Sequence, residues 1–343
     1  MYVNSNNEWG KLKSIVVGRA ENAHFPTQDS IYTTSMAEGG WKETPPPSGK
    51  VPTHIIDETV QDLYKLCDIL TRLDVKVYRP EIKDFTKTVS TKDWTTDSQY
   101  AYCPRDTHLV VGNMVIEAPM TTRARQDEAI LLDKIRREAI QDQARWISAP
   151  RPRLLDSENI IDGKFKLNDL EPAFDAANVC RLGKDLLYLI SSSGNGLGAW
   201  WLQSVLGEEY TVHTCDMYDA AHIDSTIVPI AEGTVVLNAN RVNEKNCPEV
   251  FKDWNKIYIT DDEVIPRDFY EYPYASKWIG MNMLSVDGNT IIVDENQTNI
   301  INRLERKNFT VIPTPLRHSR TLGGGFHCVT LDLEREWLTQ TIY

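Results

Sequence analysis

The sequence has no apolar run of the roughly 18 residues that a membrane-spanning helix requires, and its first ten residues lack the apolar stretch of a secretion signal. Cysteine is also sparse: six residues in 343, irregularly spaced and without a Cys-x-x-Cys pair. The usual structural zinc and dithiol motifs are therefore excluded, and free thiols are expected. Together these absences predict a cytoplasmic protein that has no membrane segment and no structural disulfides.

Positive charge is scarce as well. The chain has 37 Lys and Arg against 49 Asp and Glu, which leaves a formal net charge of -12 at pH 7. A surface of this sign repels nucleic acid and attracts a small cationic substrate. The chain is 41% hydrophobic and 25% charged, as in ordinary globular proteins with a large core. Length alone does not decide between one domain and two.

A β-hairpin pattern recurs along the chain. Apolar runs flank short turns that contain Gly112, Gly183, Gly233 and Gly288. These glycines are separated by 71, 50 and 55 residues, a spacing at which repeat architectures are considered. A fifth unit is expected from both ends of the chain, where residues 311–312 and 328–333 would join residues 12–17. Such a ring of α/β units would bring loops together in a central pit, whereas two ordinary α+β domains are the alternative.

Three other segments have local signals. Apolar residues at helical spacing predict helices over residues 60–70 and 126–140, and alternation predicts a strand over residues 75–78. Residues 26–53 contain three consecutive prolines, a Gly-Gly pair and many Ser and Thr, which predicts a long loop or lid.

Three consecutive glycines, Gly323 to Gly325, precede Phe326, His327 and Cys328 at the start of an apparent strand. Glycines let a backbone approach a ligand closely, so Cys328 is the candidate nucleophile among the six thiols. A phosphate-cradling loop is the alternative, although the Gly-Lys-Ser/Thr continuation and a following helix pattern are absent. The other cysteines are expected to be inert.

A nucleophilic thiol needs a base and a carboxylate that orients the base. His222 precedes a predicted strand, and at period two its side chain and that of Asp224 would project to the same side. Asp175 lies in an apolar setting, and Asp106 opens the first hairpin. Three acids at the starts of successive units would surround the pit with negative charge. The alternatives are turn or cap residues for each acid and a metal site for the His-x-Asp pair, which lacks further ligands at compatible spacing.

The chain also resembles a known family, the amidinotransferases of the arginine:glycine and inosamine-phosphate group, including those of cyanobacterial toxin biosynthesis, within the guanidino-group-modifying superfamily. The resemblance runs nearly from end to end, and the blocks that carry it are specific in their order and number. They are Asn7-Glu8-Trp9 with Leu12 to Gly18, Cys103-Pro104-Arg105-Asp106, Gly112-Asn113 with Ile116-Glu117-Ala118-Pro119, Phe174-Asp175-Ala176-Ala177, His222-Ile223-Asp224, Ser276-Lys277-Trp278 with Met281-Asn282, and Leu322 to Cys328.

The resemblance implies the pentein fold, a five-bladed pseudo-symmetric α/β propeller, with residues 1–343 forming a single amidinotransferase domain. It implies transfer of the amidino group of L-arginine to an amine acceptor through an amidino-cysteine intermediate, by a ping-pong sequence and without a metal or organic cofactor. It is compatible with a homodimer. The roles implied are Cys328 as nucleophile, His222 as general acid and base with Asp175 as its partner, Asp106 and Asp224 at the guanidinium, and Arg241 and Ser276 at the donor's carboxylate.

The sequence departs from this family pattern at three places. Asn178 stands where relatives often have an acid, Ala275 stands where a serine is common, and the stretch from residue 213 to 222 is shorter than in glycine-using enzymes. The last two predict a roomier acceptor pocket, for an amine larger than glycine in secondary-metabolite biosynthesis. Two other functions are weighed: an arginine deiminase-type hydrolase that forms citrulline, and a non-catalytic pentein that binds a partner.

Overall fold

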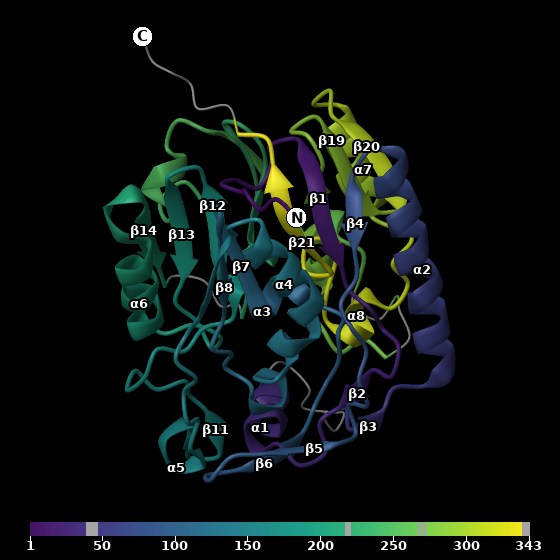
Figure 1. Cartoon of the computed structure of the whole chain (residues 1–343). Helices are drawn as coiled ribbons and strands as arrows, with labels where there is room; N and C mark the ends of the chain where they lie inside the picture. Colours follow the sequence, from purple (N-terminus) through teal and green to yellow (C-terminus); the bar gives the residue numbers. More distant parts are fainter. Residues whose placement is uncertain (39–46, 217–220, 267–268, 270–271, 338–343) are drawn as a thin grey trace.

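The computed structural model describes the chain except residues 39–46, 217–220, 267–268, 270–271 and 338–343 (Figure 1). In this described part, five three-stranded sheets share one topology. In each sheet two antiparallel strands are followed by a third strand that is parallel to the second. The sheets, in hydrogen-bonding order, are β21 (Thr330–Arg335), β1 (Leu12–Val17) and β4 (Lys76–Tyr78); β7 (His108–Val111), β8 (Met114–Glu117) and β9 (Arg145–Ser148); β12 (Val179–Leu182), β13 (Asp185–Leu189) and β14 (Thr211–Cys215); β15 (Ile227–Ala231), β16 (Thr234–Asn238) and β17 (Asn255–Ile259); and β18 (Leu284–Ser285), β19 (Thr290–Asp294) and β20 (Thr310–Thr314).

The four predicted hairpins are present, and a glycine makes each turn. Gly112, Gly183, Gly233 and Gly288 have φ values of 55°, 89°, 67° and 77°, in the left-handed region that glycine adopts most readily. This backbone requirement is local, which explains why the sequence pattern found the turns.

The fifth sheet joins the two ends of the chain, as predicted. β1 pairs antiparallel with β21, from Leu12 opposite Arg335 to Val17 opposite Thr330. Residues 311–312 were wrongly expected in this sheet: they belong to β20, which pairs with β19 in the preceding unit. Parallel neighbours need a crossover, and helix α7 (Thr298–Glu305) supplies it between β19 and β20.

Helices occupy the equivalent crossovers of three other sheets: α2 (Thr53–Arg72), α4 (Asp133–Gln141) and α6 (Gly196–Leu206). Figure 1 shows α2 and α6 on the outer sides of their sheets. The predicted helix over residues 60–70 lies in α2. The one over residues 126–140 is partly wrong, because a 3-10 segment, η2 (Glu128–Leu132), replaces its first half. No helix in the described residues is both long and apolar enough to span a membrane.

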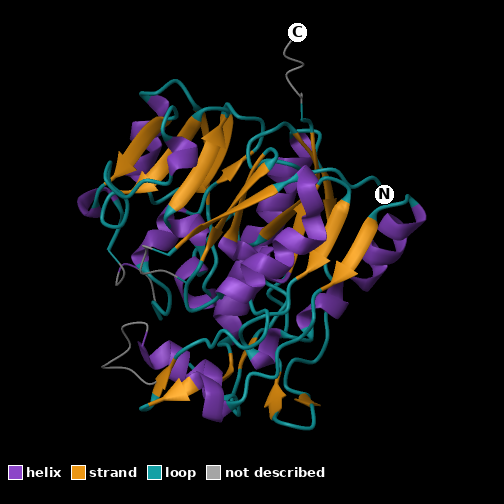
Figure 2. Cartoon of the chain, turned by 90° about the vertical axis from the view of Figure 1, so that its left-hand side faces the viewer, coloured by secondary structure: helices purple, strands orange, loops and turns teal. Residues whose placement is uncertain are grey.

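The segment predicted as a loop, residues 26–53, is not all loop. It contains α1 (Ser30–Glu38), and β3 (Gly49–Lys50) pairs with β2 (His24–Phe25) just before the segment. The buried carboxylate of Asp29 caps α1 by accepting from the backbone N–H of Ile31 and Tyr32, a local signal that the loop interpretation overlooked. In both views these elements lie with other short strands and helices at one end of the molecule (Figures 1 and 2). Residues 39–46 of the predicted lid lie outside the described residues, and a lid role stays a prediction.

A short helical turn precedes the first strand of every sheet. These turns are α3 (Pro104–Thr107), η3 (Ala176–Asn178), η5 (Ile223–Ser225), η9 (Lys277–Met281) and α8 (Ser319–Leu322). They contact one another in sequence, α3 with η3, η3 with η5, η5 with η9, and η9 with α8, while α3 also contacts β21. The repeated sheets therefore bring five such turns into one cluster.

Candidate active site

The thiol of Cys328 lies in this cluster, two residues before β21, and is buried. The glycines before it are needed for space: a Cβ on Gly324 would lie 2.5 Å from Cys103 Sγ and 3.1 Å from Cys328 Cβ. The backbone N–H groups of His327 and Cys328 donate to Asn282 Oδ1 at 2.9 and 3.0 Å. Because these amides are already used, the phosphate-cradling interpretation of the glycines is disfavoured.

His222 faces two carboxylates from two other units. Its Nε2 lies 3.0 Å from Asp175 Oδ2, and its Nδ1 lies 3.7 Å from Asp106 Oδ1. Asp175 is itself fixed, since its Oδ1 accepts from the backbone N–H and the hydroxyl of Thr121 at 2.9 and 3.0 Å. Asp175 therefore orients the imidazole, as a partner of a general acid and base must.

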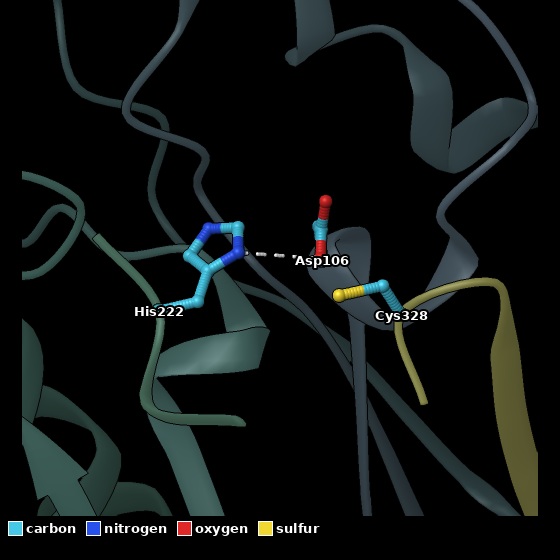
Figure 3. Close-up of side chains that lie close together, drawn as sticks. All are labelled: Asp106, His222 and Cys328. Carbon is cyan, nitrogen blue, oxygen red and sulfur yellow. Dashed lines mark ion pairs between the residues drawn. The ribbon is translucent and has the colours of Figure 1, made fainter. Parts of the chain in front are cut away.

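Asp106 has one oxygen held by the protein and one left over. Its Oδ2 accepts from Arg125 at 2.6 Å, while Oδ1 is buried and has no hydrogen-bond partner among the described residues. Figure 3 shows the side chains of Asp106, His222 and Cys328 pointing toward one another from three different segments. A ligand atom of each residue lies within 4.8 Å of those of the other two. An unpaired buried carboxylate oxygen is costly, so a donor from a ligand fits here.

Asp224 also contacts the thiol. Its Oδ2 is 3.2 Å from Cys328 Sγ and 2.9 Å from His327 Nδ1. His222 and Asp224 were expected to project to one side from an extended segment, but His222 is the N-cap of the 3-10 turn η5 (Ile223–Ser225), Asp224 lies inside that turn, and the two side chains use different partners. Both still reach the Cys328 site.

Burial and charge set the protonation states. Burial opposes the charged imidazole, but Asp106 and the hydrogen bond to Asp175 raise the pKa of His222 well above its ordinary value. The adjacent Cys103 thiol, burial and Asp224 raise the pKa of Cys328 well above its ordinary value. At neutral pH the site therefore holds an imidazolium and a neutral thiol.

The carboxyl groups differ from one another. Burial raises the pKa of Asp106 despite the nearby His222 and Arg125. Burial also acts to raise the pKa of Asp175, but the hydrogen bond and charge of His222 outweigh it and lower that pKa. In Asp224 the hydrogen bond and charge of His327 outweigh burial and lower the pKa to about 2. Asp175 and Asp224 are therefore carboxylates at neutral pH.

The last two predicted residues adjoin this site through η5 and η9. Arg241 follows β16 and donates to Thr226 Oγ1 at 2.8 Å, two residues after Asp224. Ser276 is exposed and caps η9, where its hydroxyl accepts from the backbone N–H of Trp278 at 3.3 Å. A role of Arg241 and Ser276 toward a substrate stays a prediction.

The sequence interpretation missed several residues that hold the site together: Asn282, His327, Arg125 and Thr121. Asn282 donates to Cys328 Sγ at 3.2 Å in addition to its backbone contacts. One signal was available, because Asn282 lies two residues before β18, as Asp106 lies two before β7. The others needed three-dimensional information.

Asp106, His222 and Cys328 are also close enough to be considered as metal ligands. A metal needs a deprotonated thiol and a neutral imidazole. The raised pKa values of Cys328 and His222 oppose both states. A metal would have to displace a proton from both residues, and the absence of a cofactor stays a prediction.

No protein-family profile matches the chain. It is 45% identical to inosamine-phosphate amidinotransferase 1 of Streptomyces glaucescens, over 99% of this chain and 98% of that protein. It is 33% identical to an L-arginine:L-lysine amidinotransferase of Pseudomonas savastanoi pv. phaseolicola, over 96% and 94%. It is 32% identical to a mitochondrial glycine amidinotransferase of Xenopus laevis, over 99% of this chain and 84% of that protein.

Solved structures agree with these relatives. The inosamine-phosphate amidinotransferase StrB1 of Streptomyces griseus matches with a TM-score of 0.92 and 43% identity, over 99% of this chain and 98% of that one. A dimethylarginine dimethylaminohydrolase of Pseudomonas aeruginosa matches with a TM-score of 0.63 and 13% identity, over 94% of this chain and 99% of that one. The second likeness concerns the fold alone, and together they identify the α/β pentein fold.

Proposed function

The chain belongs to the amidinotransferase family and is an enzyme, and we propose that it moves the amidino group of L-arginine to a primary amine through a covalent intermediate on Cys328. One observation carries the arginine assignment: the buried Asp106 Oδ1, which has no hydrogen-bond partner among the described residues, lies near the thiol and His222. A guanidinium offers N–H donors and positive charge in one plane, which matches an acidic site with an unsatisfied acceptor.

Asp106 and Asp224 bind the guanidinium between them and hold its carbon against Cys328 Sγ. Charge delocalisation makes a guanidinium a poor electrophile, so fixed orientation is a large part of the catalysis. The arriving cation also lowers the pKa of Cys328, because positive charge beside the sulfur favours the thiolate. Binding of arginine therefore activates the thiol that is neutral in the free enzyme.

Attack of the thiolate forms the sulfur–carbon bond and gives a tetrahedral adduct. His222, charged and oriented by Asp175, gives its proton to the departing nitrogen, and the carbon–nitrogen bond breaks to release ornithine. The amidino group stays on the sulfur. An acceptor amine, deprotonated by neutral His222, then attacks the same carbon and expels the thiolate, which completes a ping-pong cycle.

We propose that Arg241 and Ser276 bind the carboxylate of arginine at the rim of the site. We also propose that the five sheets are blades of one closed five-bladed propeller in a single domain over residues 1–343. The unbroken series of contacts among the five turns supports closure. A cytoplasmic location and a homodimer stay predictions.

The acceptor is proposed to be larger than glycine and to belong to secondary metabolism. The 45% identical relative is named for inosamine phosphate, whereas the glycine-using relative is 32% identical. Ala275 lacks a hydroxyl next to Ser276, and the stretch before His222 is short, although its residues 217–220 lie outside the described residues. A shorter backbone before His222 and the missing hydroxyl at Ala275 would leave room in the acceptor pocket for an amine bulkier than glycine.

The intermediate can be tested with arginine labelled with ¹³C at the guanidino carbon. Incubation without an acceptor, followed by acid quenching, should leave a labelled amidino group on the peptide that contains Cys328. One molecule of ornithine should be released for each Cys328 that becomes labelled. Cys328→Ser should abolish both, while Cys247→Ser, a half-buried thiol in another part of the chain, should not. Label on another cysteine would reject the assignment of the nucleophile.

The same mixture identifies the reaction. Citrulline in place of ornithine would make the protein a hydrolase. With glycine, lysine and an aminocyclitol phosphate supplied in turn, the product that carries the label names the acceptor class. The highest kcat/KM with glycine would contradict the roomy pocket.

A further inference from the structure

His327 is a nearly buried histidine between two carboxylates, and the proposed mechanism gives it no role. Its Nδ1 lies 2.9 Å from Asp224 Oδ2, and its Nε2 lies 3.1 Å from Glu8 Oε2. Its backbone N–H is held by Asn282, and its carbonyl accepts from Arg105 at 2.9 Å. The ring is therefore fixed at both nitrogens and at its backbone.

The two contacts determine how many protons the ring carries. An ionised carboxylate only accepts hydrogen bonds, and a neutral imidazole has a single N–H. Hydrogen bonds at both nitrogens therefore need either an imidazolium or a protonated carboxyl group. Burial acts to raise the pKa of Glu8, but Arg181 and His327 lower it well below its ordinary value, and the pKa of Asp224 is about 2. The bridge therefore consists of two carboxyl groups that favour their ionised forms, and each accepts a hydrogen bond only if the facing ring nitrogen carries a hydrogen.

Glu8 is a rigid anchor for this bridge. Its Oε1 accepts from Arg181 Nε at 2.9 Å, and its Oε2 accepts from Arg181 Nη2 at 2.7 Å. Arg181 continues to the buried Asp332, with its Nη2 2.8 Å from Oδ2, and Arg105 lies 3.5 Å from Glu8. Glu8 lies in the N-terminal segment, Arg181 in β12 and Asp332 in β21, so these buried charges connect two of the sheets with the N-terminal segment.

We propose that His327 is a positioning residue for arginine cleavage: as a doubly protonated imidazolium it ties Asp224 to Glu8 and so fixes the Asp224 carboxylate beside Cys328. Both described contacts of the Asp224 side chain with Cys328 and His327 use Oδ2, so the bridge orients the carboxylate without engaging Oδ1. The inference rests on the proposed function, because Asp224 there binds the guanidinium.

The bridge also balances charge around the thiol. Two carboxyl groups, those of Glu8 and Asp224, face the His327 ring. Arg181 and Arg105 are the charged neighbours of Glu8, and Cys328 and His222 are the titratable neighbours of Asp224. Without the positive charge of His327, the buried Asp224 carboxylate beside Cys328 Sγ would lack a neighbouring charge that offsets its own. Asp224 would then take up a proton more readily, and the site would lose charge for the guanidinium.

Two neutral variants separate the two ends of the bridge. In His327→Asn the amide nitrogen can approximate the position of Nδ1 and keep a donor for Asp224, whereas in His327→Gln it can approximate Nε2 and keep a donor for Glu8. The assay is the ornithine burst from arginine without acceptor, whose rate is measured against arginine concentration and pH. It needs no knowledge of the acceptor.

We expect the arginine concentration for half-maximal burst rate to rise about tenfold or more in His327→Gln, because this variant loses one charged hydrogen bond to Asp224. The rise should be smaller in His327→Asn. The acid limb of the burst rate should move to higher pH in both, and farther in His327→Gln. A residue that only supports the fold would alter thermal unfolding without ordering the two variants in this way. His213→Gln removes a histidine–carboxylate pair, 2.7 Å long, on the outer strand β14 and should change neither quantity.

If neither variant folds, neutron diffraction from the unmodified protein at pH 8 shows whether one or both ring nitrogens of His327 carry deuterium. Deuterium on both ring nitrogens of His327 supports the bridge, and deuterium on one overturns it. Equal kinetics of both variants and the unmodified protein would also overturn it. An unmodified protein that forms no ornithine from arginine would instead reject the proposed function, which keeps the two failures apart.

Discussion

Asp106→Asn is the sharpest test of the guanidinium site, because Asp106 has one oxygen held by the protein and one left for a ligand. The change keeps the size of the side chain and removes its negative charge. Arg125 retains a hydrogen-bond partner in Glu128, whose Oε2 accepts from its Nε at 2.9 Å. The effect on activity is then separable from collapse of the site.

The expected loss follows from one interaction. A hydrogen bond between charged groups contributes about 1.5 to 3 kcal/mol, which corresponds to about 10- to 150-fold in kcat/KM for arginine. Asp106 also raises the pKa of His222, so its neutralisation lowers that pKa. In the proposed mechanism His222 must be protonated to release ornithine, and the alkaline limb of kcat/KM should therefore move to lower pH.

Thermal stability should change differently. Because burial raises the folded-state pKa of Asp106, its ionised form costs stability above that pKa, and this cost is absent at lower pH. Asparagine removes the cost at neutral pH, so the unfolding temperature should not fall. The matched control is Asp127→Asn, which breaks the 2.6 Å ion pair with Lys83 on the surface and should leave kcat/KM unchanged. Normal arginine kinetics with a lowered unfolding temperature would show that Asp106 is a structural turn residue and would refute the reasoning.

Three other predictions concern the same site. His222→Asn should slow ornithine release by about 10²- to 10⁴-fold while the far-ultraviolet circular dichroism stays unchanged, and loss of the folded signal would make His222 a core residue instead. Arg241→Ala should reduce kcat/KM for arginine more than for agmatine, which has no carboxylate, and equal losses would remove that role. Double-reciprocal plots of initial rate against arginine at several fixed acceptor concentrations should be parallel, whereas intersecting lines would contradict release of ornithine before the acceptor enters.

Sequence patterns predicted those parts of the fold that depend on local requirements. The hairpin turns were identifiable because Gly112 and its counterparts need a positive φ. Residues 311–312 were assigned to the wrong sheet, since a short apolar run does not encode its neighbour. The first half of the helix predicted over residues 126–140 is a 3-10 segment, where Glu128 turns inward to Arg125. Tertiary contacts override local propensity at such places.

The site shows the same division between local and distant information. Cys328 and His222 stand in short motifs, and the family resemblance supplied their roles along with that of Asp175. His327 stands next to Cys328 in its motif, yet its partner Glu8 is 319 residues away in the chain. A pairing across that distance leaves no periodicity or spacing in a single sequence. The bridge therefore required the structure.

Repetition explains why these distant residues meet. Each sheet presents the segment just before its first strand to the shared cluster of turns, and that segment carries Asp106, Asp175, Asp224, Asn282 and Cys328 in chain order. The fourth of these residues is an amide, whereas a further carboxylate beside the sulfur would oppose the thiolate. The amide of Asn282 instead donates to Cys328 Sγ and accepts from two backbone N–H groups. The segment before the first strand thus places a carboxyl group at the cluster in three units, an amide that contacts Cys328 Sγ in the fourth and the proposed nucleophile in the fifth.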